Sequence, residues 1–100
     1  MHARVSSYQG TGGSIESSLE QLDEVVPVVR GMDGSRGLIY LVDRGSGKSI
    51  SITLWESADA MRASEDAANR LRRDSSASSG DTIVGVERYE VAFLDVSEGS

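Results

Sequence analysis

The sequence predicts an α+β fold of the ferredoxin-like βαββαβ type, a four-stranded antiparallel sheet with two helices on one face. Three observations predict it. Two apolar runs flank a glycine-rich turn in the middle of the chain and form a hairpin. Apolar residues at helical spacing lie before and after this hairpin, and a strand-like segment lies at each end of the chain.

The composition fits one folded domain, which we expect to span residues 1–96, with a polar tail over residues 97–100. The net charge of -6 argues against nucleic acid or an anionic membrane surface as a partner. The N-terminus lacks the apolar core of a signal peptide, and no apolar run reaches membrane-spanning length, so we expect a cytoplasmic location. Cysteine is absent, which excludes disulfides and thiolate chemistry.

The first third of the chain predicts a strand and then a helix. Residues 2–9 alternate as a strand, with Ala3, Val5 and Ser7 on one face and His2, Arg4, Ser6 and Tyr8 on the other. Glycine-rich residues 10–13 end this strand. A helix is expected from near Ser14 or Ser17, either of which would cap it. Pro27 should kink or end this helix, because proline cannot donate to the hydrogen-bond ladder.

The central hairpin predicts its own register. If Asp43 pairs with Lys48 across the loop 44–47, the remaining pairs follow by counting. One face then carries Gly37, Ile39, Leu41, Ile50, Ile52 and Leu54. The other face pairs Arg36 with Trp55 and also carries Leu38, Tyr40, Val42, Ser49, Ser51 and Thr53. We expect the apolar face to pack under the helices, and the mixed face to form a cavity wall or to meet a partner sheet.

The last part of the chain predicts a helix, a loop and a strand. Ser57 would cap a helix that runs to about Arg73, and residues 74–81 predict a mobile polar loop. The final strand is expected from about Ile83 to Val96. Its alternation is interrupted by charged residues, so a bulge or a change of partner is expected partway and its faces stay unassigned.

Both helices of such a fold cover one face of the sheet, so the other face needs a cover. In the proposed register the uncovered face is that of Leu38, Tyr40, Val42 and Trp55. A second copy of the chain is the economical cover, and a homodimer is therefore expected.

The hairpin region also resembles a known family. The run G-S-R-G-L-I-Y-L-V-D-R-G-S-G-K-S-I-S-I-T-L-W-E-S-A-D-A, followed by Y-E-V at Tyr89–Val91, resembles dimeric α+β barrel proteins. More narrowly, it is similar to the antibiotic-biosynthesis-monooxygenase-like group and its uncharacterised bacterial members. The W-E-S at a strand-to-helix junction and the D-x-x-x-G-K hairpin carry this resemblance, and the order of elements extends it over nearly the whole chain. It implies two sheets that face each other in a dimer, with a cleft in each subunit.

The resemblance implies a monooxygenase-like protein that binds a small aromatic or apolar compound and needs no metal, flavin or other cofactor. Family members include cofactor-independent oxygenases, in which the substrate's own anion reacts with oxygen, and haem-degrading enzymes. Trp55 matches the family tryptophan at that junction. The following helix often carries a histidine in the family and has none here, which argues against haem degradation. The alternative is a non-catalytic dimeric ligand-binding or accessory protein of the same fold.

The candidate ligand-binding residues are Tyr8, Arg36, Tyr40 and Trp55, and no catalytic residue can be assigned. Trp55 is either a structural residue whose indole N–H finds a partner, which we favour, or the flat wall of an aromatic pocket. Tyr40 would offer its hydroxyl to a ligand. Arg36 and Arg88 would neutralise an acidic ligand, or would simply pair with nearby carboxylates.

Other kinds of site find little support in the sequence. Gly45–Ser49 (G-S-G-K-S) suggests a phosphate loop, but Val42 stands where the Walker pattern needs glycine, and a strand follows instead of a helix. A catalytic triad would have to use His2, the only histidine. Carboxylates are spread over a helix surface, so we expect no metal site.

Overall fold

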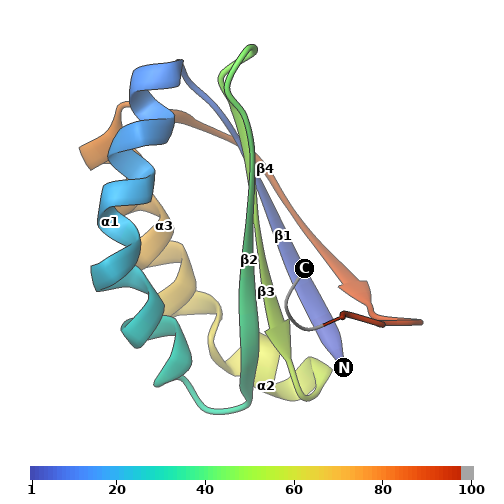
Figure 1. Cartoon of the computed structure of the whole chain (residues 1–100). Coiled ribbons are helices and arrows are strands. Elements are labelled where there is room, and N and C mark those ends of the chain that lie inside the picture. Colours follow the sequence, from blue (N-terminus) through green and yellow to red (C-terminus); the bar gives the residue numbers. More distant parts are fainter. Residues whose placement is uncertain (98–100) are drawn as a thin grey trace.

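A computed structural model of the chain describes residues 1–97. In chain order the elements are β1 (His2–Gln9), α1 (Gly12–Arg30), β2 (Ser35–Asp43), β3 (Lys48–Trp55), α2 (Ala58–Ala63), α3 (Glu65–Ser79) and β4 (Thr82–Glu90). The strands form one antiparallel sheet in the order β2-β3-β1-β4, and α1 and α3 lie side by side on one face of it (Figure 1). The predicted ferredoxin-like α+β fold is confirmed.

Helix α1 begins earlier and ends later than the sequence predicts. Thr11 is its N-cap, and the Thr11 hydroxyl accepts a hydrogen bond from the backbone N–H of Ser14 at 3.2 Å. The helix continues past Pro27 to Arg30, so this proline does not end it. The carbonyl of Pro27 instead accepts from the N–H of Gly31, the C-cap, at 3.0 Å.

The predicted second helix is two helices, and the predicted loop at 74–81 is wrong. Helices α2 and α3 meet at Ser64, and α3 continues through the serine-rich segment to Ser79. Two of its serines, Ser76 and Ser79, are buried, because their side chains are small enough to fit between the helix and its neighbours. Gly80 then ends the helix in the left-handed conformation, and its N–H donates to the carbonyl of Ser76 at 2.9 Å.

Strand β4 is shorter than predicted and contains the expected irregularity. It ends at Glu90 instead of Val96. Its register with β1 shifts between Ser7 and Tyr8, which confirms the predicted bulge. Residues 91–97 lie outside any helix or strand, and residues 98–100 of the predicted tail lie outside the described residues.

The register of the β2–β3 hairpin is as predicted over most of its length. The pairs run from Asp43 and Lys48 to Gly37 and Leu54. The prediction is wrong at the far end, where Trp55 pairs with Ser35 and not with Arg36. Gly37 has a φ of 152°, a conformation that suits glycine, and this allows the strand to bulge between Ser35 and Gly37.

The two faces of the hairpin are assigned the wrong way round in the sequence prediction. The mixed face, with Leu38, Tyr40, Thr53 and Trp55, lies under the helices. The apolar face is open, and its Ile39 and Leu41 side chains are 38% and 47% exposed. The β1–α1–β2 segment connects two parallel strands across β3, and the hand of such a connection decides which face the helix covers. Hydropathy alone does not reveal that choice.

Candidate functional site

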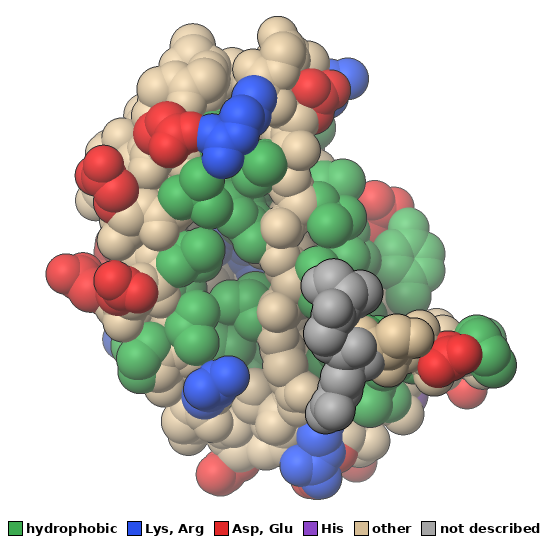
Figure 2. Space-filling model, viewed as in Figure 1, with side chains coloured by type: hydrophobic (Ala, Val, Ile, Leu, Met, Phe, Trp, Pro, Cys, Tyr) green, Lys and Arg blue, Asp and Glu red, His purple; other side chains and the backbone are tan. Residues whose placement is uncertain are grey.

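A cavity of about 110 Å³ lies between the sheet and the helices α1 and α3. Its walls are mainly apolar and include Leu22 and Val25 of α1, Leu38 of β2 and Leu71 of α3. Figure 2 shows a hollow bordered by hydrophobic side chains between α1 and the edge strand β2. The mixed face of the sheet is therefore a cavity wall, which is one of the two roles predicted for it.

Three of the four predicted ligand-binding residues share this cavity. Tyr8, Tyr40 and Trp55 all line it, and the Tyr8 hydroxyl lies 3.2 Å from the hydroxyl of Ser51. Arg36 is elsewhere. Its side chain is 53% exposed and forms an ion pair with Glu56 at 2.9 Å on the surface. The bulge at the start of β2 explains the difference, because it takes Arg36 out of register with Trp55.

Trp55 is fully buried at the end of β3, with no exposed surface. Its indole N–H donates to the Thr53 hydroxyl at 2.9 Å, so the polar atom of this side chain is satisfied within the same strand. Ser57 follows directly and caps α2, accepting from the N–H of Ala60 at 3.1 Å. The W-E-S sequence thus ends a strand, closes one end of the cavity and starts the next helix.

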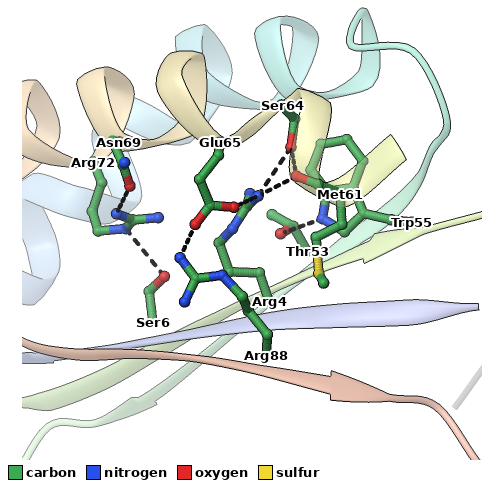
Figure 3. A network of polar contacts seen from close by, with 10 residues as sticks. All are labelled: Arg4, Ser6, Thr53, Trp55, Met61, Ser64, Glu65, Asn69, Arg72 and Arg88. Carbon is green, nitrogen blue, oxygen red and sulfur yellow. Dashed lines mark hydrogen bonds and ion pairs between the residues drawn. The ribbon is translucent and has the colours of Figure 1, made fainter. Parts of the chain in front are cut away.

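A network of polar side chains lies beside Trp55, and the sequence analysis did not single it out (Figure 3). Its centre is Arg4 of β1, which is only 2% exposed and lines the cavity. The Arg4 Nη2 donates to the Met61 carbonyl at 2.7 Å, to the Ser64 hydroxyl at 3.0 Å and to the Glu65 carboxylate at 2.7 Å. The guanidinium carbon of Arg4 also lies 5.4 Å from the centre of the Trp55 ring, within the range of a cation–π contact.

Two further arginines approach the same region. Arg88 of β4 forms a second ion pair with Glu65. Arg72 of α3 donates to the Ser6 hydroxyl at 3.2 Å and to the Asn69 side-chain oxygen at 2.6 Å. Burial, followed by the charges of Arg72 and Arg88, lowers the pKa of Arg4 to about 10. A signal for Arg4 was present in the sequence, because strand alternation places it on the same face as Ser6 and Tyr8.

The other end of the cavity is lined by a hydroxyl group and a carboxylate group. Ser76 and Asp81 contribute to its lining, where α3 ends and β4 begins. The Ser76 hydroxyl and one carboxylate oxygen of Asp81 are buried and have no hydrogen-bond partner within residues 1–97. The cavity therefore has Arg4 at one end and an unpaired carboxylate oxygen at the other, with Arg72 and mainly apolar walls between them.

The cavity does not fit a haem. A cavity of ~150 Å³ in another protein accommodates a single benzene, and the present cavity is of that scale. His2, the only histidine of the chain, does not contribute to its lining. Within residues 1–97, no three or more histidine, aspartate or glutamate side chains are grouped to hold a metal ion. No helix in this part of the chain is long and apolar enough to span a membrane.

Comparison with known sequences finds relatives of unknown function. No family model matches the chain. The uncharacterized protein Rv2557 of Mycobacterium tuberculosis is 36% identical over 95 residues, which cover 94% of this chain and 42% of that protein. The uncharacterized protein Rv2558 of the same organism is 32% identical over 95 residues, with 94% and 40% covered. The chain thus spans about two fifths of the length of these relatives.

Comparison with solved structures is more informative about the fold. A proposed antibiotic biosynthesis monooxygenase from Deinococcus radiodurans aligns with a TM-score of 0.73 at 15% identity, covering 99% of this chain and 100% of that chain. SnoaB, a cofactor-independent oxygenase from Streptomyces nogalater, aligns as its N63A mutant with a TM-score of 0.70 at 14% identity, covering 93% and 94%. The chain has the fold of the antibiotic biosynthesis monooxygenases. The family resemblance predicted from the hairpin sequence is confirmed at this level.

Proteins with this fold differ in what they do and how they assemble. The haem-degrading protein MhuD of Mycobacterium tuberculosis aligns with a TM-score of 0.64 at 21% identity, covering 97% of this chain and 100% of that chain. A dimeric ferredoxin-like protein from an uncultured marine organism aligns with a TM-score of 0.60 at 12% identity, covering 96% and 93%. The fold neighbours therefore include oxygenases, a haem-degrading protein and a dimer, and these similarities establish the fold alone.

Proposed function

We propose that this protein binds a small aromatic or apolar compound in the cavity and acts on it as a cofactor-independent monooxygenase. The observation that carries the proposal is the cavity wall, where Trp55, Tyr40 and Tyr8 contribute aromatic rings to a mainly apolar lining. Such a space, with a few polar groups at fixed positions, is typical of small-molecule sites. The shared fold with a cofactor-independent oxygenase supports the same proposal.

The chemistry requires little from the protein beyond the pocket. An ionised hydroxyaromatic compound reacts with O₂ itself: a ring CH₂ group becomes a carbonyl, one oxygen atom enters the product, and the other leaves as water. The substrate supplies all four electrons, so no external reductant is needed. The protein would exclude bulk water, hold the ring between the apolar walls of the cavity and favour the anion electrostatically.

A non-catalytic ligand-binding role is the second candidate, and one observation favours it. The carboxylate of Glu65, the acidic group of the Arg4 network, is occupied by ion pairs with Arg4 and Arg88. It is therefore poorly placed to take a proton from a substrate as a general base. A protein of this kind would bind the same compounds without consuming oxygen.

We further propose that the protein is a homodimer that associates through the open face of the sheet. This replaces the face expected from the sequence. The open face carries the apolar residues Ile39, Leu41, Ile50, Ile52 and Leu54 on neighbouring strands. A contiguous apolar surface of this kind is typical of an interface between protein chains.

Binding can be tested through Trp55, the only tryptophan of the chain. We expect 1,4-naphthoquinone to quench its emission saturably, whereas a collisional quencher such as iodide should have little effect because Trp55 is buried. Tyr40→Phe should weaken the saturable quenching. Tyr89→Phe, on the exposed part of β4, is the matched control and should leave it unchanged. Quenching that rises linearly without saturation would contradict a binding site.

Catalysis is tested separately with an oxygen electrode and resorcinol, a single-ring hydroxyaromatic compound of the size that the cavity accommodates. Oxygen uptake above the uncatalysed rate, with the carbonyl product found by mass spectrometry, would support the monooxygenase. Saturable binding without oxygen uptake for any hydroxyaromatic compound tried would leave the ligand-binding role.

A further inference from the structure

Arg4 is a buried cation whose hydrogen-bonding capacity is only partly used. One of its terminal nitrogens, Nη2, makes all of its hydrogen bonds, to Met61, Ser64 and Glu65. Its Nε and Nη1 are buried and have no hydrogen-bond partner within residues 1–97. A buried donor without an acceptor is costly, and the cost is greater when the group is charged. The site is therefore short of an acceptor.

The charged side chains around Arg4 also include fewer negative than positive groups. Arg4, Arg72 and Arg88 gather around Glu65, and Glu65 pairs with two of them. Within the described part of the chain, Arg72 has only neutral partners, the side chains of Ser6 and Asn69. This group of side chains thus has three positive charges and one negative charge, and two of its arginines, Arg4 and Arg72, line the cavity. An anion placed here would be stabilised by the positive potential.

We propose that the cavity selects the anionic form of its ligand, a small aromatic or apolar acid whose carboxylate or ionised hydroxyl binds at Arg4 beside Arg72. This rests on the proposed function, because it assumes that the cavity is a ligand site. Arg4 and Arg72 both line the cavity, so they can reach a molecule inside it. The guanidinium carbon of Arg4 lies 5.4 Å from the centre of the Trp55 ring, so the charge is next to a buried aromatic ring.

The opposite end of the cavity gives the ligand a direction. Asp81 has a buried carboxylate oxygen without a partner there, and it would repel an anionic group. The cavity is long enough to separate its two ends. Arg4 and Tyr8, which both line it, lie on the same face of β1 four residues apart, which is about 13 Å along a strand. The acid group would therefore lie toward Arg4. A hydroxyl or other donor on the far side of the ring would lie toward Asp81 and Ser76.

The test compares acids with their neutral amides on the full chain at pH 7 and constant ionic strength. Benzoate and salicylate carry the charge, and benzamide and salicylamide keep the same ring without it. Isothermal titration calorimetry should show at least tenfold tighter binding of each acid than of its amide. Equal binding of acid and amide would overturn this inference and leave the proposed function standing. If the acids, the amides and 1,4-naphthoquinone all fail to bind, the proposed function falls as well.

Two substitutions assign the effect to Arg4. Arg4→Met should abolish the preference for the acid, because it removes the positive charge and keeps an apolar side chain of similar length. Arg62→Met is the matched control, since Arg62 is an exposed arginine that pairs with Asp59 on α2. An Arg4→Met protein that folds and still prefers the acid would contradict the proposal.

If Arg4→Met fails to fold, a second variant that is expected to bind the acids more tightly tests the role of Arg4. Glu65→Gln removes the carboxylate that competes with the ligand for Arg4, so we expect several-fold tighter binding of the acids and no change for the amides. The acids should also raise the melting temperature of this variant more than that of the unmodified protein. Asp59→Asn, which frees the exposed Arg62, should change neither. Weaker binding of the acids to a folded Glu65→Gln protein would overturn the assignment.

Discussion

The two faces of the sheet are made by the same strands and differ in an unexpected way. The face that the chain covers with its own helices carries Arg4, Tyr8, Ser51 and Thr53 around Trp55. The face that it leaves open carries an almost unbroken apolar surface across β2 and β3. A chain that needed only a stable core would bury the apolar face and expose the polar one. This distribution of residues supports the two proposals made above, a ligand site on the covered face and an interface between subunits on the open face.

The largest expected effect concerns the open face. Ile52→Asp would place a charge in the middle of the proposed interface, and an unpaired buried charge is strongly unfavourable. We expect the dimer dissociation constant to rise at least ~100-fold, about 3 kcal/mol. Light scattering over a concentration series would show the mass halve while circular dichroism stays unchanged. Val28→Asp, at an exposed apolar position on α1, is the control and should keep the dimer. A folded protein that is monomeric before any substitution would contradict the interface.

The next effect concerns the covered face. Trp55 is fully buried, so Trp55→Ala should lower the free energy of unfolding by ~3–5 kcal/mol, as is usual for a large aromatic residue. Trp55→Phe should cost less than ~1.5 kcal/mol, because the neighbouring cavity tolerates a changed ring shape. Urea unfolding, monitored by circular dichroism, measures both. A loss of several kcal/mol on Trp55→Phe would mean that this ring is close-packed on all sides and is no wall of a ligand site.

A smaller effect on stability tests whether the Thr53 hydroxyl supports the fold, in contrast to the polar groups that are available to a ligand. The Thr53 hydroxyl accepts the indole N–H of Trp55. Thr53→Val should leave that buried N–H without a partner and reduce the free energy of unfolding by ~1–3 kcal/mol. Thr53→Ser keeps the acceptor and serves as the control in the same urea titration. Equal stability of the two variants would show that the indole N–H finds another acceptor.

The smallest effect concerns the turn between β2 and β3, which sets the register of these two strands. The Asp43 carboxylate accepts from the N–H of Gly45 at 3.1 Å, and hydrogen bonds from Ser46 and Gly45 lower its pKa. A lowered pKa in the folded state means that the stabilisation is present at neutral pH and is lost as the pH falls through that pKa. Asp43→Asn should therefore be slightly less stable than the unmodified protein at pH 7. The difference should shrink as the pH falls below about 4, the usual pKa of aspartate. A difference that grows on acidification would contradict this role.

The sequence predicts the elements and the hairpin register well, because both depend on local patterns. Strand alternation, the Asp43–Lys48 turn and the Ser57 cap are each determined by a few neighbouring residues. The open face was misassigned because the choice depends on how α1 crosses from β1 to β2, and this crossing leaves no mark on the hairpin itself. The sequence predicts a loop at the serine-rich end of α3 because serine has a weak helix preference, which the tertiary packing of Ser76 and Ser79 overrides.

The site was predicted only in part for a similar reason. Tyr8, Tyr40 and Trp55, three of the four candidate ligand-binding residues, line one cavity, and their ligand-binding role stays a prediction. Arg4 was missed, since a charged residue on a strand is usually solvated. Its burial depends on Ser64 and Glu65, about 60 positions further along the chain, and no local pattern links them to β1.

The hollow between α1 and β2 also limits how this protein can assemble. Strand β2 is the edge of the sheet, and the hollow opens beside it (Figure 2). If another chain added a strand along that edge, the added strand would block the opening and prevent a ligand from entering or leaving. The proposed association through the open face would leave this opening free in both subunits. A ligand would then enter on one side of the sheet while the subunits meet on the other.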